Sequence, residues 1–178
     1  MIKNIILTGQ PHSGKSTLLQ RLLPDIPQRR GFITREILQE GVRRGFEVWT
    51  DDNIDFVLAH VEYSSLPYRV SRYGVDVAGF EAILPPLFEY QPNQLLYLDE
   101  IGQMELFSDK FKSLVENYLD APNLFMGTLS AVYHDEFTTV VRSRKDILIV
   151  EITPENREQK YQEMKEWLKI NNNKSGRF

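Results

Sequence analysis

Short apolar segments alternate with amphipathic segments along most of this chain. The apolar run Ile5-Ile6-Leu7 predicts a strand buried on both faces, and the leucines of 18–23 recur at helical spacing. Further apolar strands are predicted at 94–100, 123–129 and 146–152. Helices are predicted at 77–90, after an N-cap at Ser108, at 133–141 and from Thr153 onward. Strands that alternate with helices imply an α/β fold with a mostly parallel central sheet and helices on both of its faces.

Residues 31–72 follow a different pattern. Gly31–Ile37 alternates between apolar and polar residues, and a turn after it leads into a second alternating run at 45–50. A third short run follows at 55–60. Together these runs predict a small antiparallel β insertion, after which Tyr73–Asp76 returns the chain to the main body.

The sequence also predicts where several helices begin, break or end. Pro85-Pro86 lies inside the helical pattern of 77–90 and predicts a kink or break there. Thr153-Pro154-Glu155 is typical of a helix start, with proline in the first turn and an acid beside it. The polar tail Asn171–Phe178 is expected to be frayed, which leaves a single domain over residues 1–170.

Composition narrows the class of protein. The 178 residues suit one domain, and 26% charged residues with a net charge of −4 give no indication of a nucleic-acid or membrane partner. The absence of cysteine excludes thiol chemistry and cysteine-ligated zinc. The N-terminus shows no signal-peptide pattern, and no apolar run reaches about 18 residues. We therefore expect a cytoplasmic protein, and a monomer.

A phosphate-binding motif follows the first predicted strand. The segment satisfies the pattern G-x-x-x-x-G-K-[ST] and stands between a strand and a helix, as that motif requires. Backbone N–H groups of such a turn, at the positive end of a helix, can hold phosphates. Lys15 would reach the outer phosphates, and the Ser16 hydroxyl would ligate Mg²⁺. The predicted phosphate-binding residues are Gly9, Gln10, Pro11, His12, Ser13, Gly14, Lys15, Ser16 and Thr17.

Two carboxylates end the apolar strand of 94–100. Asp99 matches the Walker-B position, where an aspartate completes the Mg²⁺ shell beside Ser16. Glu100 follows directly and can orient a water molecule toward the terminal phosphate. Since both strands end at the same edge of a parallel sheet, these side chains are expected to converge with the phosphate loop.

Transition-state charge on a transferred phosphoryl group is often compensated by an arginine. Arg142 and Arg144 precede the last predicted strand and are the catalytic candidates, with Arg72 as a further one. Thr128 and Ser130 end a strand and could sense the terminal phosphate, although such residues more often serve turns.

Several segments resemble one family. Asp99–Ser108 is similar to the DEIGKMELFS signature of the THEP nucleoside-triphosphatases, which are also called cancer-related nucleoside-triphosphatases. Gly31–Ile37 resembles the family's GFxTxEV segment, and Arg43–Phe46 resembles its R-x-GF. The resemblance continues in order through 73–81, 142–146 and 152–157.

The resemblance implies a RecA-like P-loop fold and Mg²⁺-dependent hydrolysis of nucleoside triphosphates, with ATP, GTP, CTP and UTP all accepted. It implies that Asp99 holds Mg²⁺, that Glu100 holds the attacking water, and that Gly102 belongs to the nucleotide site. Two positions depart from the family pattern. Gln103 stands where the signature has lysine, which would slow turnover if that lysine neutralises phosphate, and His12-Ser13 replaces Gly-Val.

Two other functions remain open on the residues alone. A nucleotide or small-molecule kinase also uses a P-loop and an aspartate, and the 31–72 insertion could form its acceptor pocket. Glu100 beside Asp99 favours water as the acceptor instead. A nucleotide-dependent switch selective for guanine would require an Asn-Lys-x-Asp motif that recognises the base, and Arg144-Lys145-Asp146 does not supply it.

Overall fold

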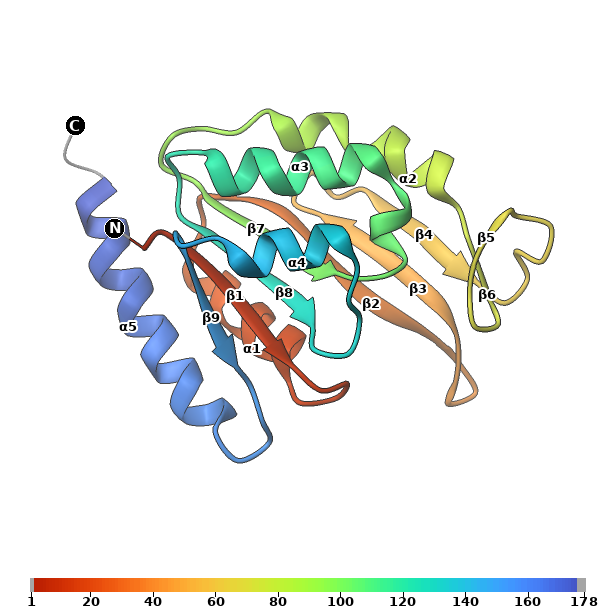
Figure 1. The fold of residues 1–178 in the computed structure, drawn as a ribbon, viewed down its shortest axis with the longest axis horizontal. Coiled ribbons are helices and arrows are strands. Elements are labelled where there is room, and N and C mark those ends of the chain that lie inside the picture. The colour runs from red at the N-terminus through yellow and green to blue at the C-terminus, as the bar shows by residue number, and fades with distance from the viewer. Residues whose placement is uncertain (1, 176–178) are drawn as a thin grey trace.

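A computed structural model describes residues 2–175, in which nine strands form one mixed sheet flanked by helices (Figure 1). The parallel half of the sheet runs in the order β9-β1-β8-β7-β2. Its strands are β1 (Asn4–Gly9), β2 (Arg29–Gln39), β7 (Leu95–Ile101), β8 (Phe125–Ser130) and β9 (Ile147–Glu151). All six residues of β1 are buried, as the uninterrupted apolar run predicted. One strand, β8, separates β1 from β7, so the two motif-bearing strands are not hydrogen-bonded to each other.

The antiparallel half continues the same sheet beyond β2. Its strands are β3 (Val42–Thr50), β4 (Asp55–His60), β5 (Tyr68–Val70) and β6 (Tyr73–Val75). Strand β2 is shared by both halves, because it pairs in parallel with β7 and antiparallel with β3. The predicted antiparallel insertion is therefore present, and β2 joins it to the parallel strands. The prediction that Tyr73–Asp76 returns the chain to the main body was wrong, because Tyr73–Val75 forms β6 and pairs antiparallel with β4 and β5.

Helices cover both faces of the sheet (Figure 1). On one face, apolar side chains of α1 (Lys15–Leu22), the short helix η1 (Leu23–Asp25) and α5 (Arg157–Ser175) pack together around the inward side of β1. The elements of the opposite face are α2 (Val77–Ile83), η2 (Pro85–Phe88), η3 (Glu105–Phe107), α3 (Asp109–Asp120) and α4 (Glu136–Ser143). Two apolar cores, one on each side of a buried sheet, are what a parallel α/β fold requires, so the predicted fold class is confirmed.

Several predicted boundaries are confirmed and others differ. The helix predicted at 133–141 is α4, which runs from Glu136 to Ser143 because Asp135 caps it in a capping box. The helix of 77–90 breaks at Pro85, and the Ser108 side chain accepts a hydrogen bond from the Phe111 N–H as an N-cap.

The last helix, predicted from Thr153, is regular from Arg157 onward. Thr153 and Asn156 exchange hydrogen bonds, and the Arg157 N–H donates to the Thr153 carbonyl oxygen, so a capping turn at Thr153 leads into it. The helix runs to Ser175, so the tail is helical through that residue, since extending a helix is easier than starting one. Residues 176–178 lie outside the described part of the chain.

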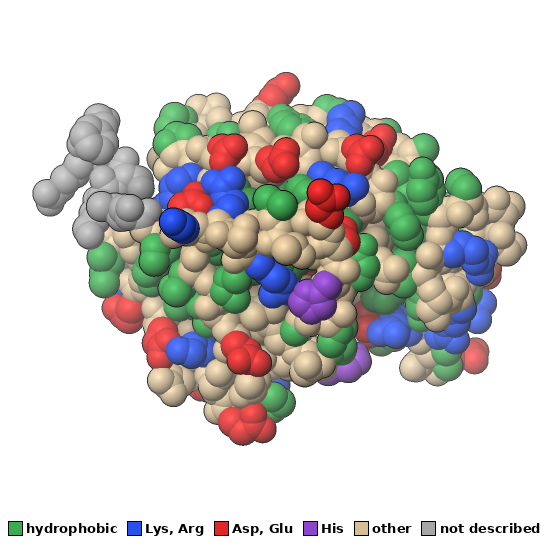
Figure 2. All heavy atoms as spheres, in the orientation of Figure 1, with side chains coloured by type: hydrophobic (Ala, Val, Ile, Leu, Met, Phe, Trp, Pro, Cys, Tyr) green, Lys and Arg blue, Asp and Glu red, His purple; other side chains and the backbone are tan. Residues whose placement is uncertain are grey.

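Surface charge is mixed. Acidic and basic side chains are interspersed on the face seen in Figure 2, in keeping with the small net charge. Within residues 2–175, no helix is both long enough and apolar enough to cross a bilayer.

Candidate active site

A cleft of about 490 Å³ opens where the parallel strands end. Its walls come from the phosphate loop and α1, from β2 and β3, and from the ends of β7 and β8, with one residue of α5. The lining residues are Pro11, His12, Gly14, Lys15, Ser16, Thr17, Thr34, Arg35, Glu36, Arg43, Phe46, Glu100, Ser130 and Arg157. The carboxyl ends of parallel strands are where open α/β sheets bind ligands, so this cleft is the candidate active site.

The phosphate loop turns tightly at Gly14, which is the N-cap of α1. Its φ of 103° lies in the left-handed region that favours glycine, and a Cβ there would meet Arg157 Cδ at 3.3 Å. Lys15 follows and is only 8% exposed. Its Nζ donates hydrogen bonds of 3.1 Å to the carbonyl oxygens of Gly9 and Gln10. The loop therefore holds a buried ammonium group at the N-terminus of α1, where an anion is favoured.

Asp99 is the most constrained polar group of the site. Its side chain is fully buried, and its Oδ1 accepts hydrogen bonds of 2.7 Å from both Ser16 Oγ and Thr128 Oγ1. Gln20 Nε2 donates to the other carboxylate oxygen at 3.3 Å. Burial raises the pKa of Asp99, whereas these donors and the charge of Lys15 oppose that rise. The carboxylate is thus fixed in position directly beside Ser16.

The chemistry of these groups fits a hard divalent cation. A serine hydroxyl that donates its proton to Asp99 keeps its lone pairs free, and a carboxylate beside it supplies a second hard oxygen. Among the described residues there is no group of three or more His, Cys, Asp or Glu side chains that could hold a metal alone. A cation that keeps several waters and also binds phosphate oxygens needs no such cage, so Ser16 and Asp99 suffice as protein ligands.

Glu100 lines the cleft one residue beyond Asp99, and a third carboxyl group lies behind it. Glu105 of η3 is 4% exposed, and burial together with the charge of Glu100 raises its pKa to about 8. Gly102 makes room for both groups, because a Cβ at this position would lie 2.9 Å from Glu105 Oε2 and 3.1 Å from Glu100 Oε1. Burial first, and the neighbouring Asp99 second, also raise the pKa of Glu100. Gly102 itself does not line the cleft.

The wall opposite the phosphate loop comes from the antiparallel half of the sheet. Thr34 Oγ1 donates a 2.6 Å hydrogen bond to the carbonyl oxygen of Asp99, which ties β2 to the end of β7. Arg43 of β3 is held by Glu36 at 2.7 Å and by the Tyr73 hydroxyl at 3.1 Å. These contacts close the cleft on the side of Glu100, since β2 is the neighbour of β7 in the sheet.

The predicted arginines are dispersed. Arg142 of α4 donates to the Ser130 carbonyl oxygen, and Ser130 lines the cleft. Arg144 is far from the phosphate loop, at the amino end of β9, where its Nη2 forms 2.8 Å ion pairs with Asp120 and Asp146. Arg72 is exposed and hydrogen-bonds the Arg43 carbonyl oxygen. The structure thus brings Arg142 to the rim of the site and does not bring Arg144 or Arg72 into it.

The two departures from the family pattern differ in their positions. Gln103 is exposed and does not line the cleft. His12 does line it and has a φ of 64°, a left-handed conformation that costs a non-glycine residue about 1 kcal/mol. Slower turnover through Gln103 stays a prediction.

Sequence reasoning missed several residues that line the cleft or that contact Asp99 behind it. Gln20 lies one helical turn after Ser16, so helical spacing from the motif could have indicated its contact with Asp99. Thr128 was considered as a phosphate sensor, but it donates its hydrogen bond to Asp99. Arg35 and Arg157 carried no local signal, because only the path of β2 and the start of α5 bring them to the cleft.

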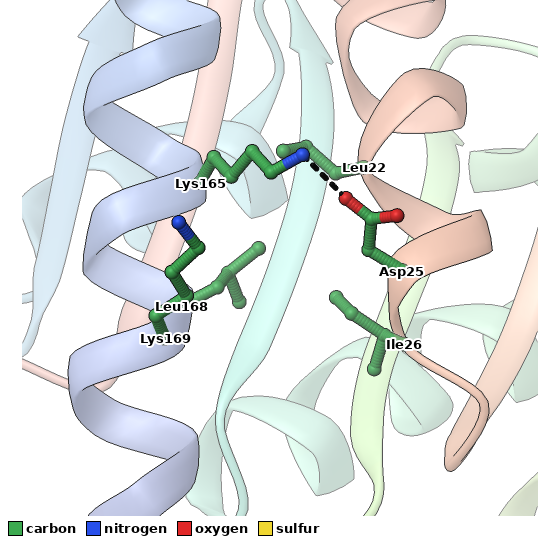
Figure 3. A pocket seen from close by; sticks show the side chains of 6 residues that line it. All are labelled: Leu22, Asp25, Ile26, Lys165, Leu168 and Lys169. Atoms are coloured by element: carbon green, nitrogen blue, oxygen red, sulfur yellow. Dashed lines mark ion pairs between the residues drawn. The ribbon is translucent and has the colours of Figure 1, made fainter.

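A second cavity, of about 350 Å³, lies between α5 and the end of α1 (Figure 3). Lys165 Nζ forms a 2.6 Å ion pair with Asp25 across it, and Leu22, Ile26 and Leu168 supply its apolar part. None of the phosphate-loop residues lines it, so it is a contact between helices and not the candidate active site.

The fold and the site together define a P-loop nucleotide-binding protein of the α/β class. A family described as NTPase matches residues 4–164. The chain is 35% identical over 169 residues to the nucleoside-triphosphatase THEP1 of Thermotoga sp. strain RQ2, covering 94% of this chain and 96% of that protein. The chain therefore belongs to the THEP nucleoside-triphosphatase family, as the sequence segments indicated.

Solved structures support this placement. The crystal structure of THEP1 from the hyperthermophile Aquifex aeolicus superimposes with a TM-score of 0.83 at 29% identity, covering 93% of this chain and 98% of that one. The solution structure of a human cancer-related nucleoside triphosphatase gives a TM-score of 0.77 at 30% identity, with 93% and 97% covered. The names of all these relatives describe triphosphatases, which does not favour the kinase alternative.

Proposed function

We propose that this chain hydrolyses nucleoside 5'-triphosphates to nucleoside diphosphate and phosphate, with Mg²⁺ as cofactor and with ATP, GTP, CTP and UTP as substrates. The observation that carries the proposal is the hydrogen bond between Ser16 and Asp99. It joins the phosphate loop to a strand end whose next residue, Glu100, faces the same cleft as Lys15. Family membership agrees with hydrolysis.

Each residue has a separate task in this proposal. The backbone N–H groups of Gly9–Thr17 and the Lys15 ammonium group hold the phosphate chain. Glu100 accepts a hydrogen bond from a water molecule and orients the oxygen of that water toward the terminal phosphorus. The new P–O bond forms as the bond to the bridging oxygen breaks, the diphosphate leaves with that electron pair, and the proton of the water ends in solvent.

Ser16 and Asp99 would hold the cation. When bound, Mg²⁺ supplies positive charge against the phosphate oxygens and favours the ionised forms of the buried Asp99 and the half-buried Glu100. Arg142 stays a candidate for compensating charge, because it is held at the Ser130 carbonyl oxygen on the rim of the cleft. Arg144 is not part of the proposal, since its guanidinium group is engaged by Asp120 and Asp146.

The test is phosphate release from ATP, GTP, CTP and UTP, with and without a panel of nucleoside and sugar acceptors. Free phosphate that appears without any acceptor, and that EDTA abolishes, is the expected result. Transfer of the phosphoryl group to an acceptor, with little free phosphate, would replace the hydrolase by the kinase. Strong preference for a single base would contradict the broad substrate range and leave the hydrolase intact.

A further inference from the structure

Arg35 is a cation of the cleft that the proposed mechanism does not use. It lies on β2 two residues after Ile33, whose side chain packs on the α1 face of the sheet, so alternation places Arg35 on that same face. It lines the cleft together with Lys15, Ser16 and Glu100. The family pattern GFxTxEV leaves position 35 unspecified, so the resemblance assigns this arginine no role.

The guanidinium group of Arg35 rests on an aromatic ring. Its Cζ lies 4.4 Å from the ring centroid of Trp49 on β3, and Trp49 is 39% exposed. The strand register explains this contact, because Trp49 pairs with Ile33 and is the diagonal neighbour of Arg35 on the same face. Within the described part of the chain, the guanidinium group of Arg35 has no hydrogen bond or ion pair. The ring is thus its one specific partner, and the contact is weak at an exposed position.

The other two arginines of the cleft differ from Arg35. Arg43 is fixed by hydrogen bonds to Glu36 and to the Tyr73 hydroxyl. Within the described residues the Arg157 guanidinium group likewise has no hydrogen bond or ion pair. It lies against Gly14, however, and follows β9, which is on the opposite side of β1 from β2. Arg35 stands on the same flank as Glu100, since β2 and β7 are neighbours in the sheet. In the proposed mechanism Glu100 faces the terminal phosphate, so Arg35 is the unengaged cation on the side of that phosphate.

We propose that Arg35 leaves the ring of Trp49 when a nucleoside triphosphate binds and contacts its terminal phosphate, so that the site distinguishes triphosphate from diphosphate. This inference rests on the proposed function, in which the nucleotide lies with its terminal phosphate toward Glu100. A guanidinium group matches phosphate oxygens with paired, charge-assisted hydrogen bonds, which are stronger than an exposed cation–π contact. A diphosphate lacks the terminal group and leaves Arg35 on Trp49.

The Arg35 side chain has space on two sides. Arg35 also lines a neighbouring pocket of about 260 Å³ that contains Trp49 and Gln20. It therefore stands between the two hollows, with Trp49 on one side and the phosphate loop on the other. A rotation of one exposed side chain, without movement of the strands, is all that the proposal requires.

The experiment uses Trp49 as the reporter. The chain has two tryptophans, so Trp167→Phe on α5 leaves Trp49 alone, and Trp167 is only packed against an apolar core. The Trp49 emission of this variant is titrated with a non-hydrolysable triphosphate and with the diphosphate, both with Mg²⁺. We expect the triphosphate to change the emission, the diphosphate to leave it unaltered, and Arg35→Gln to abolish the response.

Affinities measured by calorimetry complete the test. Arg35→Gln should weaken triphosphate binding about 10- to 100-fold and diphosphate binding less than about twofold. The matched control is Arg44→Gln on β3, a partly exposed arginine near Glu62 that does not line the cleft, and it should change neither affinity. Equal losses for both nucleotides, an unchanged triphosphate affinity, or an equal emission response to the diphosphate would each overturn the proposal.

The outcomes separate this inference from the proposed function. Wild-type protein that binds triphosphate through Arg35 but releases no phosphate would refute hydrolysis and leave the role of Arg35 standing. Wild-type protein that releases phosphate, with Arg35→Gln binding triphosphate normally, would refute only the role of Arg35. Wild-type protein that binds no triphosphate would refute both.

Discussion

Ser16 Oγ donates a 2.7 Å hydrogen bond to Asp99 Oδ1, although 83 positions separate the two residues in the chain. This contact joins the first turn of α1 to the end of β7. Strand β8 lies between β1 and β7, and its Thr128 donates to the same carboxylate oxygen. Three elements therefore converge on one buried oxygen, and that convergence makes the edge of the sheet a site.

Removing the hydroxyl of this contact should reduce the cation dependence of binding. For Ser16→Ala we expect triphosphate affinity in Mg²⁺ to fall about 10- to 100-fold, because one hard ligand is lost, with little change in EDTA. Calorimetry in both buffers checks this, and Ser113→Ala on the exposed face of α3 is the control. Equal losses with and without Mg²⁺ would mean that Ser16 serves the loop and not the cation.

Glu100 should affect turnover far more than binding. Glu100→Gln keeps the shape of the side chain but weakens its ability to accept a proton or orient water, so kcat should fall about 10²- to 10³-fold.

Lys15→Ala should instead weaken triphosphate binding, since it removes the charge that meets the phosphates. Steady-state phosphate release and calorimetry separate the two effects. Unchanged phosphate release by the Glu100→Gln variant would refute the proposal that Glu100 orients the attacking water.

Glu105 should make the stability of the protein depend on pH. Its pKa rises from 4.5 to about 8 in the folded protein, so the folded state keeps a proton that the unfolded state releases. The free energy of unfolding, relative to Glu105→Gln, should therefore fall by about 4 kcal/mol between pH 4.5 and pH 8.

Chemical denaturation at pH 5, 6.5 and 8, without nucleotide and with EDTA, measures this difference. Glu116→Gln on the exposed side of α3 is the control and should not change the pH slope. Parallel stability curves for wild type and Glu105→Gln would show that Glu105 titrates normally.

Arg144 should contribute to stability and not to catalysis. Its ion pairs with Asp120 and Asp146 are partly exposed, so Arg144→Gln should cost about 1 kcal/mol of unfolding free energy. Phosphate release should stay within about twofold of wild type, because the side chain lies at the amino end of β9. A tenfold loss of kcat in a folded variant would restore Arg144 as a catalytic candidate.

Local sequence was sufficient where the chemistry is carried by neighbours in the chain. The phosphate loop between β1 and α1, the carboxylates ending β7 and the cap at Ser108 depend on spacing and residue type alone. The regular part of α5 begins four residues after Thr153, because Thr153 and Asn156 exchange hydrogen bonds in a capping turn that leads into the helix.

By itself, the sequence determined the phosphate-binding motif, the two carboxylates that end a neighbouring strand, and the family to which the chain belongs. Only the tertiary structure decided which arginines line the cleft. An arginine acts within about one side-chain length, so its role depends on which edge of the sheet its element reaches. Arg144 caps the end of α4 just before the amino end of β9, whereas Arg35 stands on a strand whose far end passes the phosphate loop. That difference comes from the path of β2 across the sheet, which no local pattern encodes.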